Sequence, residues 1–260
     1  HRRGGRVMRL LVSVRSIAEA RLARDGGADF IDLKEPRDGA LGGLPAPTIS
    51  AIVEALDDDA RAHGTARLPI SATIGDLPVQ AVAAIVERAH KVAGCGVDLV
   101  KVGVDARDVQ DAGAGVDAAR RLLDALARSG LRLMPVFIAD DGLDARLLAH
   151  AAALGFAGVM ADTADKRGGS LLDRLAPADL RRFVDAARAA GMGLIGLAGA
   201  LRAADLPAVE ALGPDFAGFR SAVCAGERAD DLSLQRLRGL VAARDACGGD
   251  AIAPRPLVAA

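Results

Sequence analysis

Short apolar segments alternate with longer amphipathic segments along almost the whole chain, and this alternation constrains the fold more than any other feature. The segments predicted to be buried strands are 10–14, 29–34, 68–74, 97–104, 132–138, 156–162, 193–198 and 215–220. The segments predicted to be amphipathic helices are 16–26, 47–62, 78–94, 115–129, 142–154, 177–190, 202–211 and 230–246. Strands that alternate with helices predict right-handed crossovers and a parallel sheet.

Eight such units in 260 residues match the size of a (β/α)8, or TIM, barrel. No linker, repeat or low-complexity segment interrupts them, so we predict an α/β protein with a single barrel domain over residues 8–247. Residues 1–7 and 248–260 are expected to be tails, with Met8 as the natural start. The main alternative is a doubly wound open sheet. A dinucleotide-binding sheet of that kind needs a GxGxxG turn after its first strand, and VSVRSIAEA contains none.

The composition argues against several classes of function. The net charge is −1, and no basic run supplies the clustered cations that non-specific nucleic-acid binding requires. No apolar run reaches the about 18–20 residues that span a bilayer, and the start HRRGGRVMRL does not resemble a signal peptide. The three cysteines show no ligand spacing and are typical of a reducing cytoplasm. We therefore expect a cytoplasmic protein without nucleic-acid or membrane partners, metal site or cofactor.

Lysine is rare in this chain: of 33 basic Lys and Arg residues, only four are lysines. Lys34 ends the second predicted strand, Lys101 lies in the second half of the fourth, and Lys166 follows the sixth. Lys91 lies in the middle of a predicted helix, where a solvated surface position is expected. In a (β/α)8 barrel the C-terminal strand ends and the loops after them build the active site. Three of the four lysines are therefore expected to converge there.

Two carboxylates accompany these lysines. Side chains alternate between the two faces of a strand, so Asp32 and Lys34 share one face. The apolar Ile31 and Leu33 suit the helix layer, which turns Asp32 and Lys34 toward the barrel axis. Asp162 ends the sixth strand in the same way. We predict a polar centre of lysines and aspartates inside the barrel mouth.

Lysine can perform a reaction that arginine cannot, because only a neutral amine attacks a carbonyl to form a Schiff base. A second lysine nearby lowers the pKa of the first by like-charge repulsion, whereas an aspartate opposes that shift. Trp and Tyr are absent, and the histidines outside the N-terminal tail fall in predicted helices, so acid–base work is assigned to lysines and carboxylates. The alternative is that the lysines form buried ion pairs with Asp32, Asp98 or Asp162.

Small residues after the last two strands indicate a phosphate site, because barrels commonly bind phosphate between these two loops. Gly199, in the segment LAGAL, permits close approach of the backbone to a ligand. Arg220 and Ser221, in GFRS, are expected to donate to phosphate directly. Cys224 is expected to be an inert small apolar residue.

Small polar residues also end the third predicted strand, in SATIGD. Ser71, Thr73 and Asp76 either hold substrate hydroxyls or cap a turn, and the sequence leaves both interpretations open.

Seven segments of the chain resemble, in order, those of the (5-formylfuran-3-yl)methyl phosphate synthase family, also called 4-(hydroxymethyl)-2-furancarboxaldehyde-phosphate synthases. They are LLVSV, GGADFIDLKEPRDGALG, SATIGD, VDLVKVGV, VMADTADKRGGSLLD, LAGAL and GFRSAVCAGERADD. The resemblance spans roughly residues 8–245, and IDLKEPRDGALG and ADTADKRGGSLLD are its most specific parts.

The resemblance implies a (β/α)8 barrel lyase that makes the furan precursor of methanofuran-type one-carbon cofactors such as methylofuran. Two molecules of glyceraldehyde 3-phosphate condense, one phosphate leaves, and dehydration closes the furan ring. Carried over by position, Lys34 is the Schiff-base lysine and Lys101 the proton acceptor. Asp32, Asp162 and Lys166 complete the polar centre. Residues 105–116 and the end of the fifth strand depart from the family pattern, so no role is carried over to them.

Two alternatives remain open. One is another class I aldolase or phosphosugar lyase on the same barrel, and the other is a non-catalytic protein that binds phosphorylated metabolites. The expected partner is a small-molecule phosphorylated triose, and the oligomeric state is left open.

Overall fold

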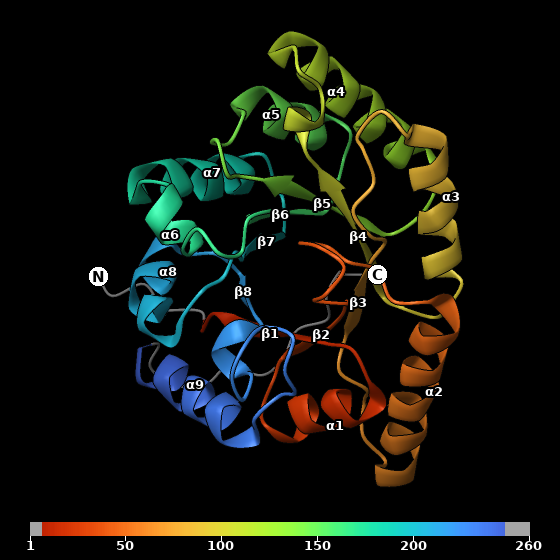
Figure 1. The fold of residues 1–260 in the computed structure, drawn as a ribbon, viewed down its shortest axis with the longest axis vertical. Coiled ribbons are helices and arrows are strands. Elements are labelled where there is room, and N and C mark those ends of the chain that lie inside the picture. The colour runs from red at the N-terminus through yellow and green to blue at the C-terminus, as the bar shows by residue number, and fades with distance from the viewer. Residues whose placement is uncertain (1–6, 248–260) are drawn as a thin grey trace.

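The computed structural model describes residues 7–247, and the two tails predicted at 1–7 and 248–260 lie, apart from Val7, outside the described residues. Eight parallel strands close into a barrel in sequential order, β1 to β8 (Figure 1). They are β1 (Arg9–Val14), β2 (Phe30–Leu33), β3 (Ile70–Thr73), β4 (Leu99–Val104), β5 (Leu133–Ile138), β6 (Gly158–Asp162), β7 (Leu194–Leu197) and β8 (Phe216–Phe219). The predicted (β/α)8 barrel is confirmed.

Helices surround the barrel as an outer ring (Figure 1). They are α1 (Ile17–Asp25), α2 (Ala46–His63), α3 (Val82–Ala93), α4 (Ala112–Arg128), α5 (Ala145–Ala153), α6 (Leu171–Arg174), α7 (Pro177–Ala189), α8 (Leu206–Leu212) and α9 (Leu234–Cys247). Short 3-10 helices follow three strands: η1 (Ala106–Asp108), η2 (Ala203–Asp205) and η3 (Ser221–Val223). None of the helices within residues 7–247 is long and apolar enough to cross a membrane.

The predicted strand ends agree with the structure to within two residues, whereas several helix starts do not. Helix α4 begins three residues earlier than predicted, because the Asp111 side chain caps it by accepting from the Ala114 N–H. Helix α9 begins four residues later, because Leu232 first pairs with Cys224 in an isolated β-bridge. The one-turn helix α6 was not predicted, since its four residues are too few to show a helical period.

Two apolar layers position the site. The strand residues that face the helices, including Ile31 and Leu33, join the large cluster between barrel and helix ring. A smaller cluster fills the barrel interior, where Phe30 and Phe216 meet edge to face with ring centroids 5.7 Å apart. Gly196 makes room for this contact, because a Cβ there would lie 2.1 Å from the Phe216 ring. The interior is therefore closed by apolar side chains below the polar strand ends.

Candidate active site

Asp32 and Lys101 form a buried ion pair at the C-terminal end of the barrel interior. Asp32 has no exposed surface, and its Oδ1 lies 2.9 Å from the Nζ of Lys101. Ser71 donates to the same oxygen at 2.7 Å, and Ser13 donates to Oδ2 at 3.1 Å. The strands place these groups together, since Ser13 pairs with Asp32 and Asp32 pairs with Ser71 in the sheet register. The inward orientation predicted for Asp32 is confirmed.

Asp162 lies opposite this pair, between two lysines. Its Oδ1 accepts from the Nζ of Lys166 and from the backbone N–H of Thr163. The Nζ of Lys34 lies 4.0 Å from Oδ2 of Asp162, which is beyond hydrogen-bonding distance. Within residues 7–247 the Lys34 amine therefore has an ion-pair neighbour but no hydrogen-bond partner to stabilise its charged form.

Burial lowers the pKa of the Lys34 amine from 10.5 to about 7. Asp162 raises it, and Lys166 lowers it by like-charge repulsion. Only 5% of Lys34 is exposed, so the amine loses most of the hydration that would stabilise its charge. The lowered pKa makes the uncharged form of Lys34, which a nucleophilic amine requires, accessible near neutral pH.

The two carboxylates stay ionised. Burial raises the pKa of Asp32, but Lys101 and Lys34 outweigh that effect and hold the pKa below its usual value. The pKa of Asp162 is lowered in the same way, with Lys166 and Lys34 outweighing the effect of burial. The centre thus combines two carboxylates with a lysine that loses its proton readily.

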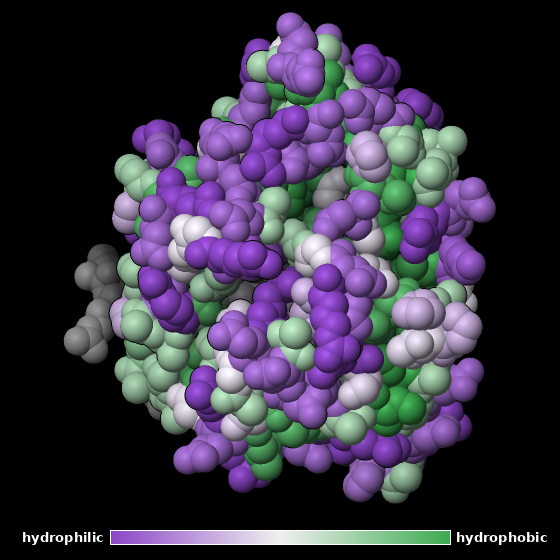
Figure 2. Space-filling view, in the orientation of Figure 1, coloured by the Kyte–Doolittle hydropathy of each residue, from purple (hydrophilic) through white to green (hydrophobic). Residues whose placement is uncertain are grey.

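A single pocket gathers all eight predicted site residues, including Gly199, Arg220 and Ser221 of the predicted phosphate site. Figure 2 views the molecule along the barrel, and hydrophilic residues cover the middle of this face. Sequence reasoning missed two further lining residues with polar side chains, Ser13 and Arg228. The alternation within LLVSV could have identified Ser13 as inward-facing, but Arg228 lies in a loop without periodicity. Nothing in the sequence separates Arg228 from the many surface arginines.

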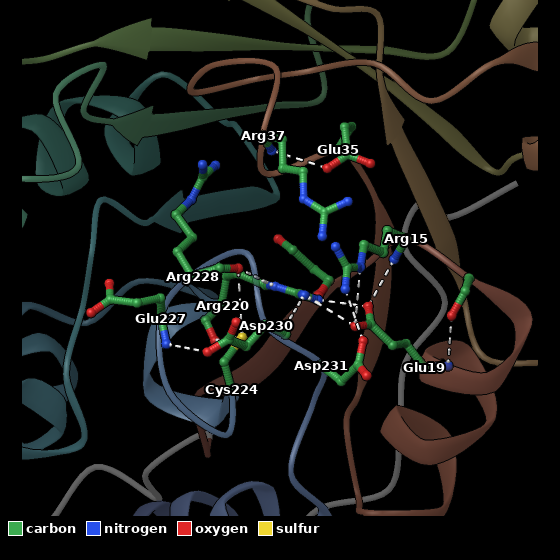
Figure 3. Close-up of polar contacts among 12 residues, drawn as sticks. Arg15, Glu19, Glu35, Arg37, Arg220, Cys224, Glu227, Arg228, Asp230 and Asp231 are labelled. Carbon is green, nitrogen blue, oxygen red and sulfur yellow. Dashed lines mark hydrogen bonds and ion pairs between the residues drawn. The ribbon is translucent and has the colours of Figure 1, made fainter.

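Arg220 has a different role from the direct phosphate contact that the sequence suggested. Its guanidinium forms a two-point ion pair with Glu19, with Nη–Oε distances of 2.6 and 3.0 Å. It also donates to the backbone carbonyls of Ser13, Arg228 and Asp230 (Figure 3). These bonds use all five N–H groups of the side chain. Arg220 is therefore engaged in holding the loops together, and it has no donor left for a ligand in this structure.

The small polar residues in and after β3 do not line the pocket but support the site, and Ser71 does so through its bond to Asp32. Thr73 donates to the Gly42 carbonyl at 2.9 Å, and Asp76 accepts from the Leu41 N–H at 3.1 Å. Both contacts fasten the loop that follows Lys34. Of the two interpretations that the sequence left open, the turn-capping one describes Asp76. Within residues 7–247 no cluster of three or more His, Cys, Asp or Glu side chains is placed to hold a metal ion.

A closed eight-stranded α/β barrel with a lysine–carboxylate centre at the C-terminal strand ends is the architecture of the (β/α)8-barrel enzymes. Among solved structures the fold is similar to phosphoribosyl anthranilate isomerase from Thermus thermophilus, with a TM-score of 0.60 at 17% identity over 92% of this chain and 99% of the other. It is also similar to 3-hexulose-6-phosphate synthase from Salmonella typhimurium, with a TM-score of 0.52 at 16% identity over 91% of this chain and 100% of the other. At these identities the likeness concerns the fold alone.

The sequence identifies the family. The profile of the 4-HFC-P synthase family matches residues 10–241. A relative from Methylorubrum extorquens, provisionally named (5-formylfuran-3-yl)methyl phosphate synthase, is 38% identical over 90% of this chain and 91% of its own length. The (5-formylfuran-3-yl)methyl phosphate synthase of Methanosarcina mazei is 33% identical over 90% of this chain and 98% of its own length. The chain belongs to the 4-HFC-P synthase family.

Proposed function

We propose that this protein is a (5-formylfuran-3-yl)methyl phosphate synthase that condenses two molecules of glyceraldehyde 3-phosphate through a Schiff base on Lys34. The observation that carries the proposal is the Lys34 amine itself, which is buried, lacks a hydrogen-bond partner within residues 7–247, and has its pKa lowered to about 7. Its position after β2, in the pocket with Lys101 and Lys166, supports a covalent role. Family membership supports the furan product.

The proposed chemistry follows from the electron demand of an iminium ion. Lys34 attacks the aldehyde carbon of one triose, and loss of water gives the iminium, which makes the neighbouring C–H acidic. Removal of that proton yields an enamine, whose carbon attacks the aldehyde of the second triose. Hydrolysis of the imine frees Lys34, and loss of one phosphate and two molecules of water from the condensed product gives the furan aldehyde. Each proton transfer requires a positioned acid or base.

Lys101 is proposed as the proton acceptor. In its resting ion pair with Asp32 the Lys101 side chain is charged, so it accepts a proton only after it has lost one. Asp32, 2.9 Å from the Lys101 Nζ, then stabilises the ammonium ion that forms again. Ser13 and Ser71 hold the Asp32 carboxylate in place from both of its oxygens. On the other side of the pocket, Lys166 is proposed to donate to oxygen atoms that gain negative charge, and the ionised Asp162 holds the Lys166 ammonium in place.

The loop after β7 is proposed to bind a substrate phosphate through its backbone. Gly199 and Ala200 both have positive φ, at 116° and 46°, so their N–H groups are turned out of the regular ladder. Neither N–H finds an acceptor within the described residues, and both residues line the pocket. Ser221, on the loop after β8, lines the same pocket and adds a hydroxyl. Backbone N–H groups of this kind bind phosphate oxygens well.

Incubation of the protein with glyceraldehyde 3-phosphate is expected to produce a furan-aldehyde phosphate together with inorganic phosphate. The product is detected by the strong near-ultraviolet absorbance of a furan aldehyde and by its mass, and a phosphate assay supplies the stoichiometry. A simple class I aldolase would give a product without that absorbance. A non-catalytic binding protein would retain phosphate esters without forming any product, and either result would contradict the proposal.

The rate of Schiff-base formation is expected to follow the protonation of Lys34. Below about pH 7 the amine is charged, so trapping by cyanoborohydride should slow by about tenfold for each pH unit and level off above pH 7. Asp162→Asn removes the neighbour that raises the Lys34 pKa, so the midpoint should move to lower pH. Lys166→Met removes a repelling charge, so the midpoint should move to higher pH, in each case by about 1 pH unit. Midpoints that move in the same direction for both variants would contradict the assignment.

A further inference from the structure

Arg228 is a cation of the pocket to which neither the family resemblance nor the proposed mechanism gives a role. It lies half-buried in the loop between β8 and α9 and lines the pocket together with Lys34, Lys166 and Gly199. The other four pocket cations each lie within 4.0 Å of a carboxylate: Lys34 and Lys166 near Asp162, Lys101 near Asp32, and Arg220 near Glu19. Among residues 7–247 no carboxylate lies that close to Arg228. Its positive charge is therefore left for another partner.

The loop that carries Arg228 is firmly held. Arg220 donates through Nε to the Arg228 carbonyl at 2.9 Å and through Nη2 to the Asp230 carbonyl at 2.6 Å. The Asp230 carboxylate in turn accepts from the Glu227 N–H at 2.7 Å. In Figure 3 the Arg228 side chain extends away from the cluster formed by Arg220 and Glu19. Arg220 thus fixes the backbone from which Arg228 reaches toward the pocket.

The Arg228 guanidinium contacts the loop that follows the Lys34 strand end. Nη1 donates to the Pro36 carbonyl, and Nη2 donates to the carbonyls of Gly39 and Ala40 at 3.2 and 3.3 Å. These three neutral acceptors take up three of the five N–H groups and leave two for a ligand. Because only Glu35 separates Lys34 from Pro36, the position of Arg228 is tied to the segment that carries the nucleophile.

The charge of the pocket indicates what the free N–H groups would bind. Lys34, Lys101, Lys166, Arg220 and Arg228 line it, against only two acids, Asp32 and Asp162. Burial lowers the pKa of Arg228, which means that the protein around it stabilises the charge less well than water does. An anion in the pocket would supply the missing compensation, and the unpaired N–H groups of Gly199 and Ala200 line the same pocket.

We propose that Arg228 binds the phosphate group of the substrate with the two N–H groups that its contacts to Pro36, Gly39 and Ala40 leave free. This inference rests on the proposed function, since it assigns Arg228 to the same substrate. It differs from the assignment that the sequence suggested, because Arg228 and not Arg220 presents free donors. A planar guanidinium forms charge-assisted hydrogen bonds with phosphate oxygens that are stronger than those of neutral donors.

The test compares two aldehydes that differ only in the phosphate, glyceraldehyde 3-phosphate and glyceraldehyde. The readout is the borohydride-trapped adduct on Lys34 as a function of aldehyde concentration. Arg228→Met is expected to raise the half-saturating concentration of glyceraldehyde 3-phosphate by about 100-fold, and Arg228→Lys by about tenfold. Trapping with glyceraldehyde should change by less than about twofold in both variants. Arg238→Met, an exposed arginine on α9, is the matched control and should behave as the wild type.

Two results of the trapping experiment would overturn this inference. Equal losses with both aldehydes would mean that Arg228 only supports the loop, and unchanged trapping with both would mean that it has no role in binding. Calorimetry with inorganic phosphate gives an answer that does not depend on the Schiff base: a Kd raised by Arg228→Met supports the inference, and an unchanged Kd contradicts it. Absence of any Lys34 adduct in the wild type, together with a raised Kd in the variant, would reject the proposed mechanism and keep the phosphate site.

Discussion

Replacement of Lys34 by alanine is expected to reduce formation of the furan product by about 10⁴-fold or more and to abolish the borohydride-trapped adduct. The reason is that Lys34 alone combines a pKa lowered to about 7 with an amine free of hydrogen bonds within residues 7–247. Lys101 and Lys166 each lie against a carboxylate, so neither can replace the nucleophile without breaking an ion pair. The measurement is initial rate by furan absorbance, with the adduct located by mass spectrometry of peptides.

Lys91→Ala is the matched control, because Lys91 is an exposed lysine on α3 far from the pocket lining. It should retain wild-type turnover and a full adduct yield. Lys34→Met keeps most of the buried side-chain volume, so this variant is expected to fold. If it is folded and inactive, the loss of activity is due to the missing amine and not to a loss of structure. Turnover by Lys34→Ala at the wild-type rate would reject Lys34 as the nucleophile.

The second large effect is expected for Lys101→Met, which should lower kcat by about 10²- to 10⁴-fold while the adduct on Lys34 still forms. A proton acceptor acts after the iminium exists, so its loss should leave an enzyme that is trapped readily but turns over slowly. The variant also leaves Asp32 buried without its closest cation, which is expected to cost about 3 kcal/mol of unfolding free energy. Adduct yield, kcat and urea unfolding are measured on the same preparation.

The double variant Asp32→Asn with Lys101→Met separates the two effects. Without the buried charge of Asp32, most of the lost stability should return, whereas kcat should stay low. Equal recovery of stability and kcat would mean that Lys101 acts only by pairing with Asp32. Loss of the Lys34 adduct in the single variant would instead place Lys101 before imine formation and contradict its role as the proton acceptor.

The fold was predictable because its signal is repeated along the chain. Each strand is buried and mostly apolar, each helix has an apolar face, and eight such pairs leave few alternatives to a barrel. The ends of the helices were less predictable, since they depend on single contacts. Asp111 extends α4 by capping it, and the bridge between Cys224 and Leu232 delays α9. Neither contact has a periodic pattern.

The location of the lysines at one end of the barrel was also predictable, because strand alternation and parallel order decide which side chains point inward and at which end. Asp32 and Lys34 follow this rule, and Asp162, at the end of β6, lines the same pocket. Which lysine pairs with which aspartate was not predictable. Lys101 lies against Asp32 and Lys166 against Asp162, and this division leaves Lys34 as the amine without a hydrogen bond within residues 7–247.

The sequence by itself determined the barrel and the set of residues at its mouth, because both follow from periodicity and chain order. Only the tertiary structure decided which of the two arginines after β8 has N–H donors available to a ligand. Arg220, conspicuous at the strand end, uses every N–H group on Glu19 and nearby carbonyls, whereas Arg228, in an irregular loop, keeps two N–H groups free at the pocket. A hydrogen-bond donor is available to a ligand only if no protein acceptor reaches it first, and that depends on contacts between distant parts of the chain.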